Sequence, residues 1–211
     1  MTSGKRTSPA LRPDRRAFIA AAAMACAVAR AQGKGTIAFD LDALMALLAQ
    51  RKSGEARFTE ERSVPGFSTP LRSSGTLSFT APDRFARHTL EPRPERFEVA
   101  GNVLRLERSG RVRQLTLDAV PELAALVEGL RGTLSGNAAL LRRHFELRLA
   151  GEAKLWTLTL TPLDKPLAMQ VLQLQLAGSG GDLRSVELQL AGEQRSLMLI
   201  EPIVAPRAPG S

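Results

Sequence analysis

Residues 144–200 read HFELRLAGEAKLWTLTLTPLDKPLAMQVLQLQLAGSGGDLRSVELQLAGEQRSLMLI, and this stretch decides the fold. Apolar and polar side chains alternate in it with a period of two, which is typical of strands with one buried face. Polar turns interrupt the alternation, so we expect five strands, over residues 144–150, 154–162, 168–177, 183–191 and 196–201. A sheet this long must cover its apolar face with other parts of the chain.

The amino-terminal half of the chain repeats this alternation in six further runs. They span residues 56–63, 73–80, 84–91, 95–100, 103–108 and 111–117. Turn residues separate the runs, and the pairs Gly101-Asn102 and Ser109-Gly110 are two-residue hairpin signals that make the flanking strands neighbours. We therefore expect a mainly β protein of the α+β class, with about eleven antiparallel strands.

Two segments have helical spacing instead. Residues 39–51 predict an amphipathic helix with Asp40 as its N-cap and leucines three or four positions apart on one face. Residues 118–143 predict a helical insertion between the two groups of strands. Its glycines at positions 129, 132 and 136 each weaken a helix by about 1 kcal/mol relative to alanine. They indicate either a mobile lid or a turn between two short helices.

The two ends of the chain differ from the rest. A basic segment that includes Arg15-Arg16 leads into a short run of small apolar residues, which ends in Ala29-Arg30-Ala31. The run is shorter than the roughly 20 apolar residues of a membrane-spanning helix. Residues 1–31 therefore predict a signal peptide, cleaved near Ala31, for the twin-arginine or the general secretory route. We expect one domain over residues 32–203 and a disordered tail over 204–211.

Cys26 is the only cysteine in the chain. It lies inside the expected signal peptide, so the mature chain would form no internal disulfide. Ala23-Met24-Ala25-Cys26 is also a degraded version of a lipidation motif, which leaves a lipid-anchored form of the protein as an alternative.

The basic character of the chain is concentrated at its amino end. The net charge is +8, but residues 1–31 hold six basic side chains and one acidic side chain, a net of +5, so the remainder holds +3. In the remainder, arginines and glutamates are interleaved along strands, as on a solvated sheet face. The chain has no tyrosine, and stacking aromatics are scarce, so we expect no nucleic-acid partner.

The sequence shows no catalytic constellation. There is no Gly-x-Ser-x-Gly elbow, and the two histidines, His88 and His144, stand alone in expected strands. Glu60 and Glu61 are adjacent in a strand, so they point to opposite faces and cannot act on one substrate atom. We therefore expect no enzyme, no cofactor and no metal site.

Four short motifs occur in an order that is similar to one known family. They are Phe58-Thr59-Glu60-Glu61, then Gly75-Thr76-Leu77-Ser78-Phe79, then Pro82-Asp83-Arg84-Phe85, and then the Gly101-Asn102 hairpin. With the leading helix and the helical insertion, this succession resembles the LolA-type periplasmic carriers of outer-membrane lipoproteins, over nearly the whole mature chain. Each motif is weak alone, and the resemblance rests on their order.

The resemblance implies a curved, incomplete antiparallel β-barrel whose concave apolar face is covered by the two helical segments. It also implies a monomeric periplasmic carrier that takes acyl chains of lipoproteins or related lipids from an inner-membrane donor to an outer-membrane acceptor. The side chains that we expect to line the cargo site are Phe79, Phe85, Phe97, Leu106, Leu123, Val127, Leu158, Leu174 and Leu188.

The chain departs from the family pattern at one position that bears on lid closure. Family carriers commonly have a basic residue before the proline of the third motif, and here that residue is Ala81. Two other readings of the same fold stay open. One is an outer-membrane-anchored acceptor lipidated at Cys26, and the other is a periplasmic sensor that binds lipids or proteins.

Overall fold

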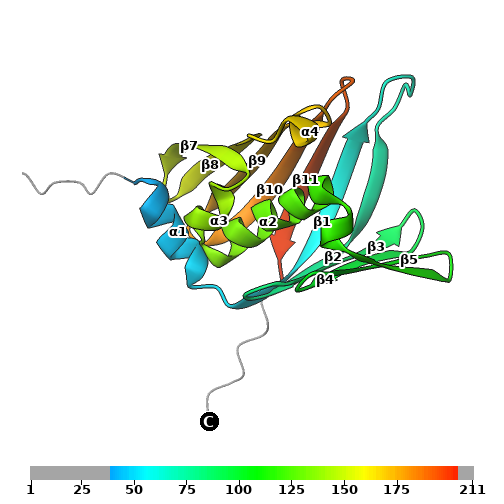
Figure 1. Cartoon of the computed structure of the whole chain (residues 1–211), viewed down its shortest axis with the longest axis horizontal. Helices are drawn as coiled ribbons and strands as arrows, with labels where there is room; N and C mark the ends of the chain where they lie inside the picture. The colour runs from blue at the N-terminus through cyan, green and yellow to red at the C-terminus, as the bar shows by residue number, and fades with distance from the viewer. Residues whose placement is uncertain (1–38, 204–211) are drawn as a thin grey trace, which may run out of the picture. The chain divides into compact units, whose positions relative to one another are not determined.

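The computed structural model describes residues 39–203, which form one antiparallel sheet of eleven strands with helices against one face (Figure 1). The mainly β prediction is therefore confirmed. The strands are β1 (Ser53–Ser63), β2 (Leu71–Thr80), β3 (Arg84–Glu91), β4 (Glu95–Ala100), β5 (Val103–Arg108), β6 (Arg111–Thr116), β7 (Phe145–Glu152), β8 (Leu155–Pro162), β9 (Val171–Ser179), β10 (Asp182–Leu190) and β11 (Arg195–Pro202). The expected signal peptide, Cys26 and the expected tail lie outside the described residues.

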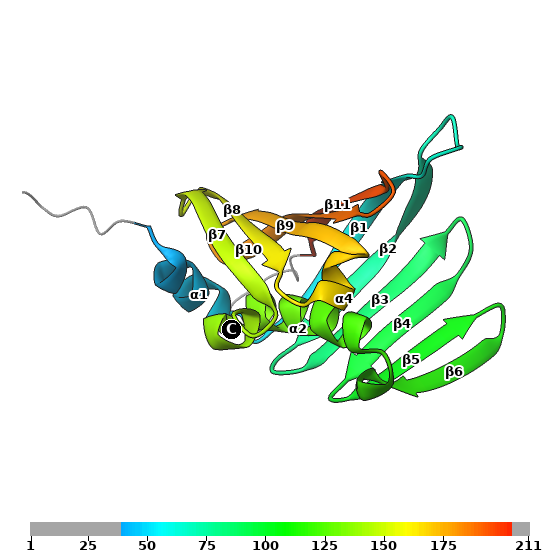
Figure 2. The same ribbon diagram turned by 45° about the horizontal axis from the view of Figure 1, so that its top comes forward.

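The sheet order is β6-β5-β4-β3-β2-β1-β11-β10-β9-β8-β7. Strands β1 and β11, the first and the last in the sequence, pair at the centre, where Phe58 lies opposite Ile200. Strands β6 and β7 are consecutive in sequence but form the two opposite edges. The connection between them must therefore cross the whole sheet, and Figure 2 shows it crossing on the concave side.

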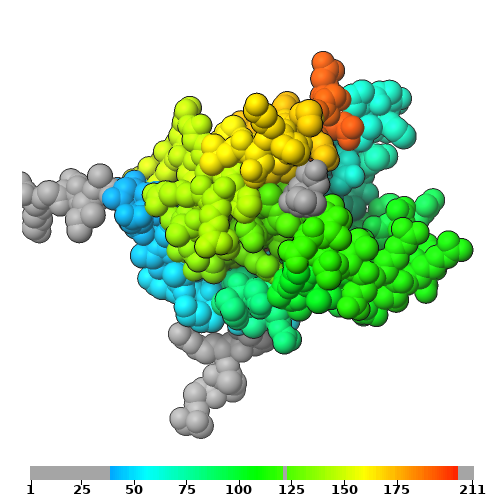
Figure 3. All heavy atoms as spheres, viewed as in Figure 1, coloured from blue at the N-terminus to red at the C-terminus, as the bar shows by residue number. Residues whose placement is uncertain are grey.

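The connection between β6 and β7 is the helical insertion expected from the sequence. It consists of the 3-10 turn η1 (Leu117–Ala119), the helix α2 (Pro121–Ser135) and the short helix α3 (Ala138–Leu141). Helix α1 (Leu41–Ala49) lies beside it and contacts both α2 and α3. In the space-filling view the insertion, in green, meets the atoms of β7–β9 and α4, in yellow-green to gold, and together they cover much of this face (Figure 3).

Helix α1 begins where the sequence predicts. The side chain of Asp40 accepts a hydrogen bond from the backbone N–H of Ala43 at 2.9 Å, as an N-cap does. Its buried face is formed by Leu44, Met45 and Leu48, at the i, i+1, i+4 spacing of a helix that packs on one side. The helix is two residues shorter at each end than expected.

The glycines of the insertion have a structural explanation. Gly136 adopts a φ of +67° and ends α2, so it is the turn between two helices. Gly129 and Gly132 lie inside α2, where an added Cβ would come within 3.0 Å of the Phe145 ring and within 2.7 Å of the Leu141 side chain. Packing alone therefore accounts for two glycines inside one helix, which the sequence-based expectation did not foresee.

The structure has a further short helix, α4 (Lys165–Ala168). The sequence predicts a turn over residues 163–167 and a strand from residue 168 instead. Pro166 suits the first turn of a helix, where no intrahelical N–H bond is needed. Leu167 is buried, so the turn is anchored to the core. As a result β9 begins at Val171 instead of at residue 168.

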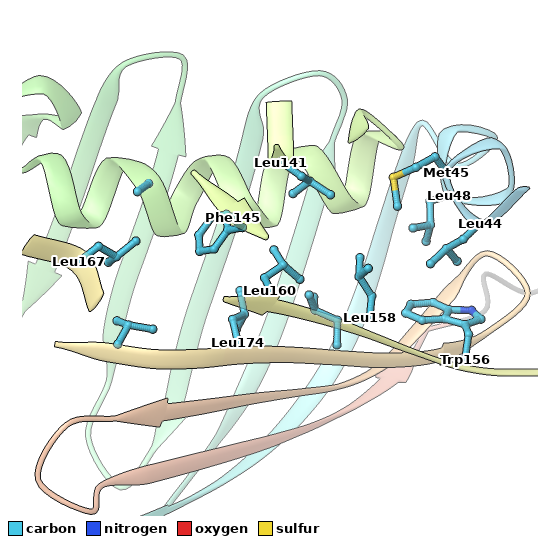
Figure 4. Packing of buried hydrophobic residues seen from close by; sticks show 13 residues of the cluster. Leu44, Met45, Leu48, Leu141, Phe145, Trp156, Leu158, Leu160, Leu167 and Leu174 are labelled. Carbon is cyan, nitrogen blue, oxygen red and sulfur yellow. The ribbon is translucent and has the colours of Figure 1, made fainter. Parts of the chain in front are cut away.

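Two groups of buried side chains fill the space between sheet and helices. The larger group joins Leu44, Met45 and Leu48 of α1 to Leu141, Phe145 and the inward side chains of β8 and β9, which point toward one another in Figure 4. Within it Trp156 is fully buried, and its Nε1–H donates to the carbonyl of Gly180 at 2.9 Å. The smaller group contains Val99, Leu104, Leu117 and Val127, and lies between β4, β5 and α2.

Candidate functional site

An apolar cavity of about 350 Å³ lies between α2 and the concave face of the sheet. Three side chains of the two buried groups, Leu48, Val127 and Leu174, reach its lining, whereas Trp156 and Leu104 do not. The helical side of the cavity consists of Leu48 of α1 and of side chains from α2. The latter are Leu123, Leu126, Val127, Leu130 and Leu134.

The sheet side of the cavity follows from the alternation of the strands. Residues of one parity on each strand face inward, so Ala56 of β1, Leu77 of β2 and Ile200 of β11 all line the cavity. Strands β3, β4, β9 and β10 add Phe85, Phe97, Leu174, Val186 and Leu188. The wall is thus built from strands of both halves of the sequence.

Seven of the nine side chains expected to line a cargo site are brought together around this cavity. They are Phe79, Phe85, Phe97, Leu123, Val127, Leu174 and Leu188. Leu158 does not line it, because it is fully buried against α1 and the neighbouring strands. Leu106 also does not line it, because it packs against the smaller buried group at the β5 side of the sheet.

The cavity wall also carries a polar cluster that the sequence reasoning missed. Glu60 of β1 is only 6% exposed and shares the inward parity of Phe58. One carboxylate oxygen accepts a hydrogen bond from Ser196 at 2.5 Å, and the other accepts one from Ser73 at 2.9 Å and one from the guanidinium of Arg87. These four residues, together with Arg62 at 3.5 Å from Glu60, are called the Glu60 cluster below.

The electrostatics of the Glu60 cluster favour the ionised carboxylate. Burial raises the pKa of Glu60, but the hydrogen bond from Ser196 and the charge of Arg87, together with Ser73 and Arg62, outweigh burial and hold the pKa below its ordinary value. Arg87 also lies over the ring of Phe58, with its guanidinium carbon 4.7 Å from the ring centroid.

Parity is the sequence signal that could have revealed this cluster. Glu60 follows Phe58 by two residues and Arg87 follows Phe85 by two, so each charge falls on the face of its strand that the phenylalanine buries. Reading Glu60 with Glu61 only as a pair of carboxylates does not use this signal. The expectation that the two point to opposite faces holds, since Glu60 is buried and Glu61 is exposed.

Helix α2 is held to the sheet by polar contacts near the cavity. Arg131 donates hydrogen bonds to the backbone carbonyls of Asp83, at 3.2 Å, and of Gly101. These carbonyls belong to the turns β2–β3 and β4–β5. Arg131 therefore joins α2 to two turns of the sheet.

The two histidines lie within hydrogen-bond distance of carboxylates rather than standing alone. His144 lies 2.6 Å from Glu128 of α2 and 3.1 Å from Asp164, and thereby joins the insertion to the start of β7. His88 lies 3.1 Å from Glu98 on the outer face of β4, and hydrogen bonding from His88 lowers the pKa of Glu98. No His, Cys, Asp and Glu side chains within residues 39–203 form a group of three or more placed to hold a metal ion.

The chain was compared with protein families, with curated proteins and with solved structures. The family described as outer membrane lipoprotein carrier protein LolA-like matches residues 33–201. A search of curated proteins found no match. Among solved structures, the LolA superfamily protein NE2245 from Nitrosomonas europaea is 11% identical, with a TM-score of 0.41, over 80% of this chain and 96% of its own.

Two further solved structures are similar at a comparable level. The lipoprotein LppX from Mycobacterium tuberculosis is 10% identical, with a TM-score of 0.35, over 79% of this chain and 98% of its own. A chain of the MucA/MucB complex from Pseudomonas aeruginosa is 15% identical, with a TM-score of 0.35, over 80% of this chain and 59% of its own.

None of the helices in the described part of the chain has the length and apolar character that crossing a membrane requires. The family match extends from the first residues after the expected signal peptide to the last strand, which is most of the chain. The chain therefore belongs to the outer membrane lipoprotein carrier protein LolA-like family.

Proposed function

We propose that this protein is a periplasmic carrier that holds acyl chains of lipoproteins or related lipids in the cavity under α2. The observation that carries the proposal is the cavity itself. Apolar side chains line it on both the helical and the sheet side, although a void of about 350 Å³ costs packing energy that a purely structural core would recover by filling it.

The energetics suit reversible binding of a hydrocarbon chain. Each methylene transferred from water into an apolar site contributes about 0.8 kcal/mol. Entry requires α2 to move away from the sheet, and Arg131 and His144 are the polar contacts that such a movement breaks. Cargo passes from an inner-membrane donor to an outer-membrane acceptor by differences in affinity, with no nucleotide, cofactor or metal in the carrier.

The first experiment is native mass spectrometry with lipid extraction on protein purified from the periplasm of its own host. A co-purifying acylated molecule supports the carrier function and identifies the cargo class. If the protein is empty and an apolar fluorescent probe also fails to bind, the cavity has no cargo and the proposal is wrong.

A cavity-filling variant tests whether the probe binds where we propose. Ala56 lies on the cavity wall, so Ala56→Phe places a ring in the void. Thr59, on the same strand, is exposed and has the opposite parity, so Thr59→Phe is a matched control. We expect Ala56→Phe to lose at least tenfold in probe affinity, which is about 1.4 kcal/mol, and Thr59→Phe to bind as the wild type does.

The mass of the mature amino terminus separates the carrier from the anchored acceptor of the same fold. Cleavage near Ala31 without a lipid supports the soluble carrier. A diacylated Cys26 would instead establish the acceptor.

A further inference from the structure

The Glu60 cluster places charge on the wall of an otherwise apolar cavity. Glu60, Arg87 and Arg62 all line it, and they come from β1 and β3, which flank β2 on either side. A charge in such a position is costly unless it is paired, so a wall that served only to hold hydrocarbon would be expected to lack it. The position of the cluster points to a polar part of the cargo.

The Glu60 cluster has more unused hydrogen-bond donors than unused acceptors. Both carboxylate oxygens of Glu60 already accept hydrogen bonds, from Ser196, Ser73 and Arg87. By contrast, the Nε of Arg87 has no hydrogen-bond partner but is itself buried, while the Arg87 side chain as a whole is 26% exposed. Arg62 is 3.5 Å from Glu60, at the limit of a hydrogen bond, and its side chain is 48% exposed. The cluster therefore has donors to spare and few acceptors.

The Glu60 cluster also carries more positive than negative charge. One carboxylate, from Glu60, faces the two guanidinium groups of Arg87 and Arg62, which leaves one positive charge in excess. The other charged lining residues, Arg51 and Glu55, precede β1 or lie near its start, and Arg51 is paired with Asp182. Partly exposed guanidinium groups beside an apolar space suit the oxygens of a planar carboxylate or of a tetrahedral phosphate.

The volume of the cavity limits the apolar part of the cargo. An apolar cavity of about 150 Å³ accommodates a benzene ring with its six carbons. By proportion, the cavity of about 350 Å³ has room for one chain of about fourteen carbons rather than for two such chains.

We propose that the cavity binds a single-chain amphiphile with an anionic head group, a carboxylate or a phosphate, with the head held by Arg62 and Arg87 and the chain against α2. This inference rests on the proposed carrier function and specifies its cargo. A neutral head would leave the spare donors unpaired, and a cationic head would meet an excess of positive charge.

Displacement of an apolar fluorescent probe by ligands of equal chain length tests the inference. The ligands are myristate, tetradecyl phosphate, tetradecanol and tetradecylammonium, each below its aggregation concentration. We expect the two anions to bind about tenfold more tightly than the alcohol, since hydrogen bonds to charged groups are the stronger ones, and the ammonium to bind least. Which anion binds more tightly identifies the head group.

Substitutions assign the preference to the cluster. Arg62→Gln should reduce the ratio of myristate to tetradecanol affinity severalfold. Arg57→Gln, on the exposed face of the same strand, is the matched control with an unchanged ratio. Because Arg87→Gln alone would leave Glu60 unpaired, the double variant Glu60→Gln/Arg87→Gln is used. It removes one guanidinium but keeps the excess of one positive charge, so it should lower the ratio less than Arg62→Gln does.

The outcomes separate this inference from the proposed function. If tetradecanol binds as tightly as myristate, or if Arg62→Gln leaves the ratio unchanged, the head-group assignment is wrong although the carrier function stands. If neither the probe nor any of the four ligands binds, both are wrong.

Discussion

Glu60 is a charged residue at a buried position of the sheet. It lies between Phe58 and Arg62 on the buried face of the central strand β1, and its charge is held by Ser196, Ser73 and Arg87. Breaking such a buried pair by changing one partner leaves the other charge uncompensated. The cluster therefore links stability to the same side chains that we propose for head-group binding.

We expect Glu60→Gln to lower the free energy of unfolding at pH 7 by about 2 kcal/mol. The exposed neighbour Glu61, of opposite parity, is the control, and Glu61→Gln should change it by less than about 0.5 kcal/mol. Urea denaturation of the wild type and both variants gives these values.

The wild type and Glu60→Gln also test how the free energy of unfolding depends on pH. Because the pKa of Glu60 in the folded protein is below its ordinary value of 4.5, the folded state binds fewer protons than the unfolded state. Its contribution is complete above that ordinary value and is lost as the pH falls through the lowered pKa. The difference in the free energy of unfolding between wild type and Glu60→Gln should therefore shrink as the pH falls below 4.5, and a constant difference would contradict this account.

Helix α2 supplies much of the helical side of the cavity. It is the middle of a connection between the two opposite edges of the sheet, so its path over the concave face is set by topology. Its attachment is set by particular side chains. Arg131 binds carbonyls at two turns of the sheet, and Gly136 allows close contact with α1.

We expect Arg131→Ala to release the probe about five- to 150-fold faster, because the two hydrogen bonds it removes contribute about 0.5–1.5 kcal/mol each. Arg142 is exposed at the end of α3, and Arg142→Ala serves as the control. Stopped-flow release rates and hydrogen exchange of α2 measure the effect. Unchanged exchange in α2 would show that Arg131 does not hold the helix.

The close contact between α1 and α2 can be tested at Gly136. An added Cβ there would lie 2.2 Å from the backbone oxygen of Met45, and the residue has a positive φ. Gly66 also has a positive φ but has no atom within 4 Å of an added Cβ. We expect Gly136→Ala to destabilise the protein by at least 1 kcal/mol more than Gly66→Ala, as measured by thermal or urea unfolding. Equal losses would mean that backbone strain alone is responsible.

The molecule as a whole should be stabilised by its cargo. A ligand that binds only the folded state at 100 times its Kd adds about 2.7 kcal/mol to the free energy of unfolding. We expect this increment with the best ligand of the displacement series, and we expect Ala56→Phe to lose most of it. Denaturation with and without ligand measures the increment in each variant, and an equal increment in both would place the binding site elsewhere.

The strands and their inward faces were predictable because alternation is a local property. All eleven strands were expected, and Phe79, Phe85, Phe97, Leu174 and Leu188 were assigned to the face that lines the cavity. Local spacing cannot say which inward residues pack fully. Leu158 and Leu106 share that inward orientation. However, Leu158 packs against α1 and Leu106 packs beside α2, so neither lines the cavity.

Alternation and helical spacing in the chain are enough to establish a half-buried sheet, a leading amphipathic helix and a helical insertion, since each depends on residues a few positions apart. The pairing of β1 with β11, the placement of β6 and β7 at opposite edges, and the meeting of Glu60 with Ser196 join residues far apart in sequence. Long-range contacts of this kind depend on how the whole sheet curves around the helices that cover it. Local periodicity holds no information about them. The cavity and its polar cluster arise from those contacts.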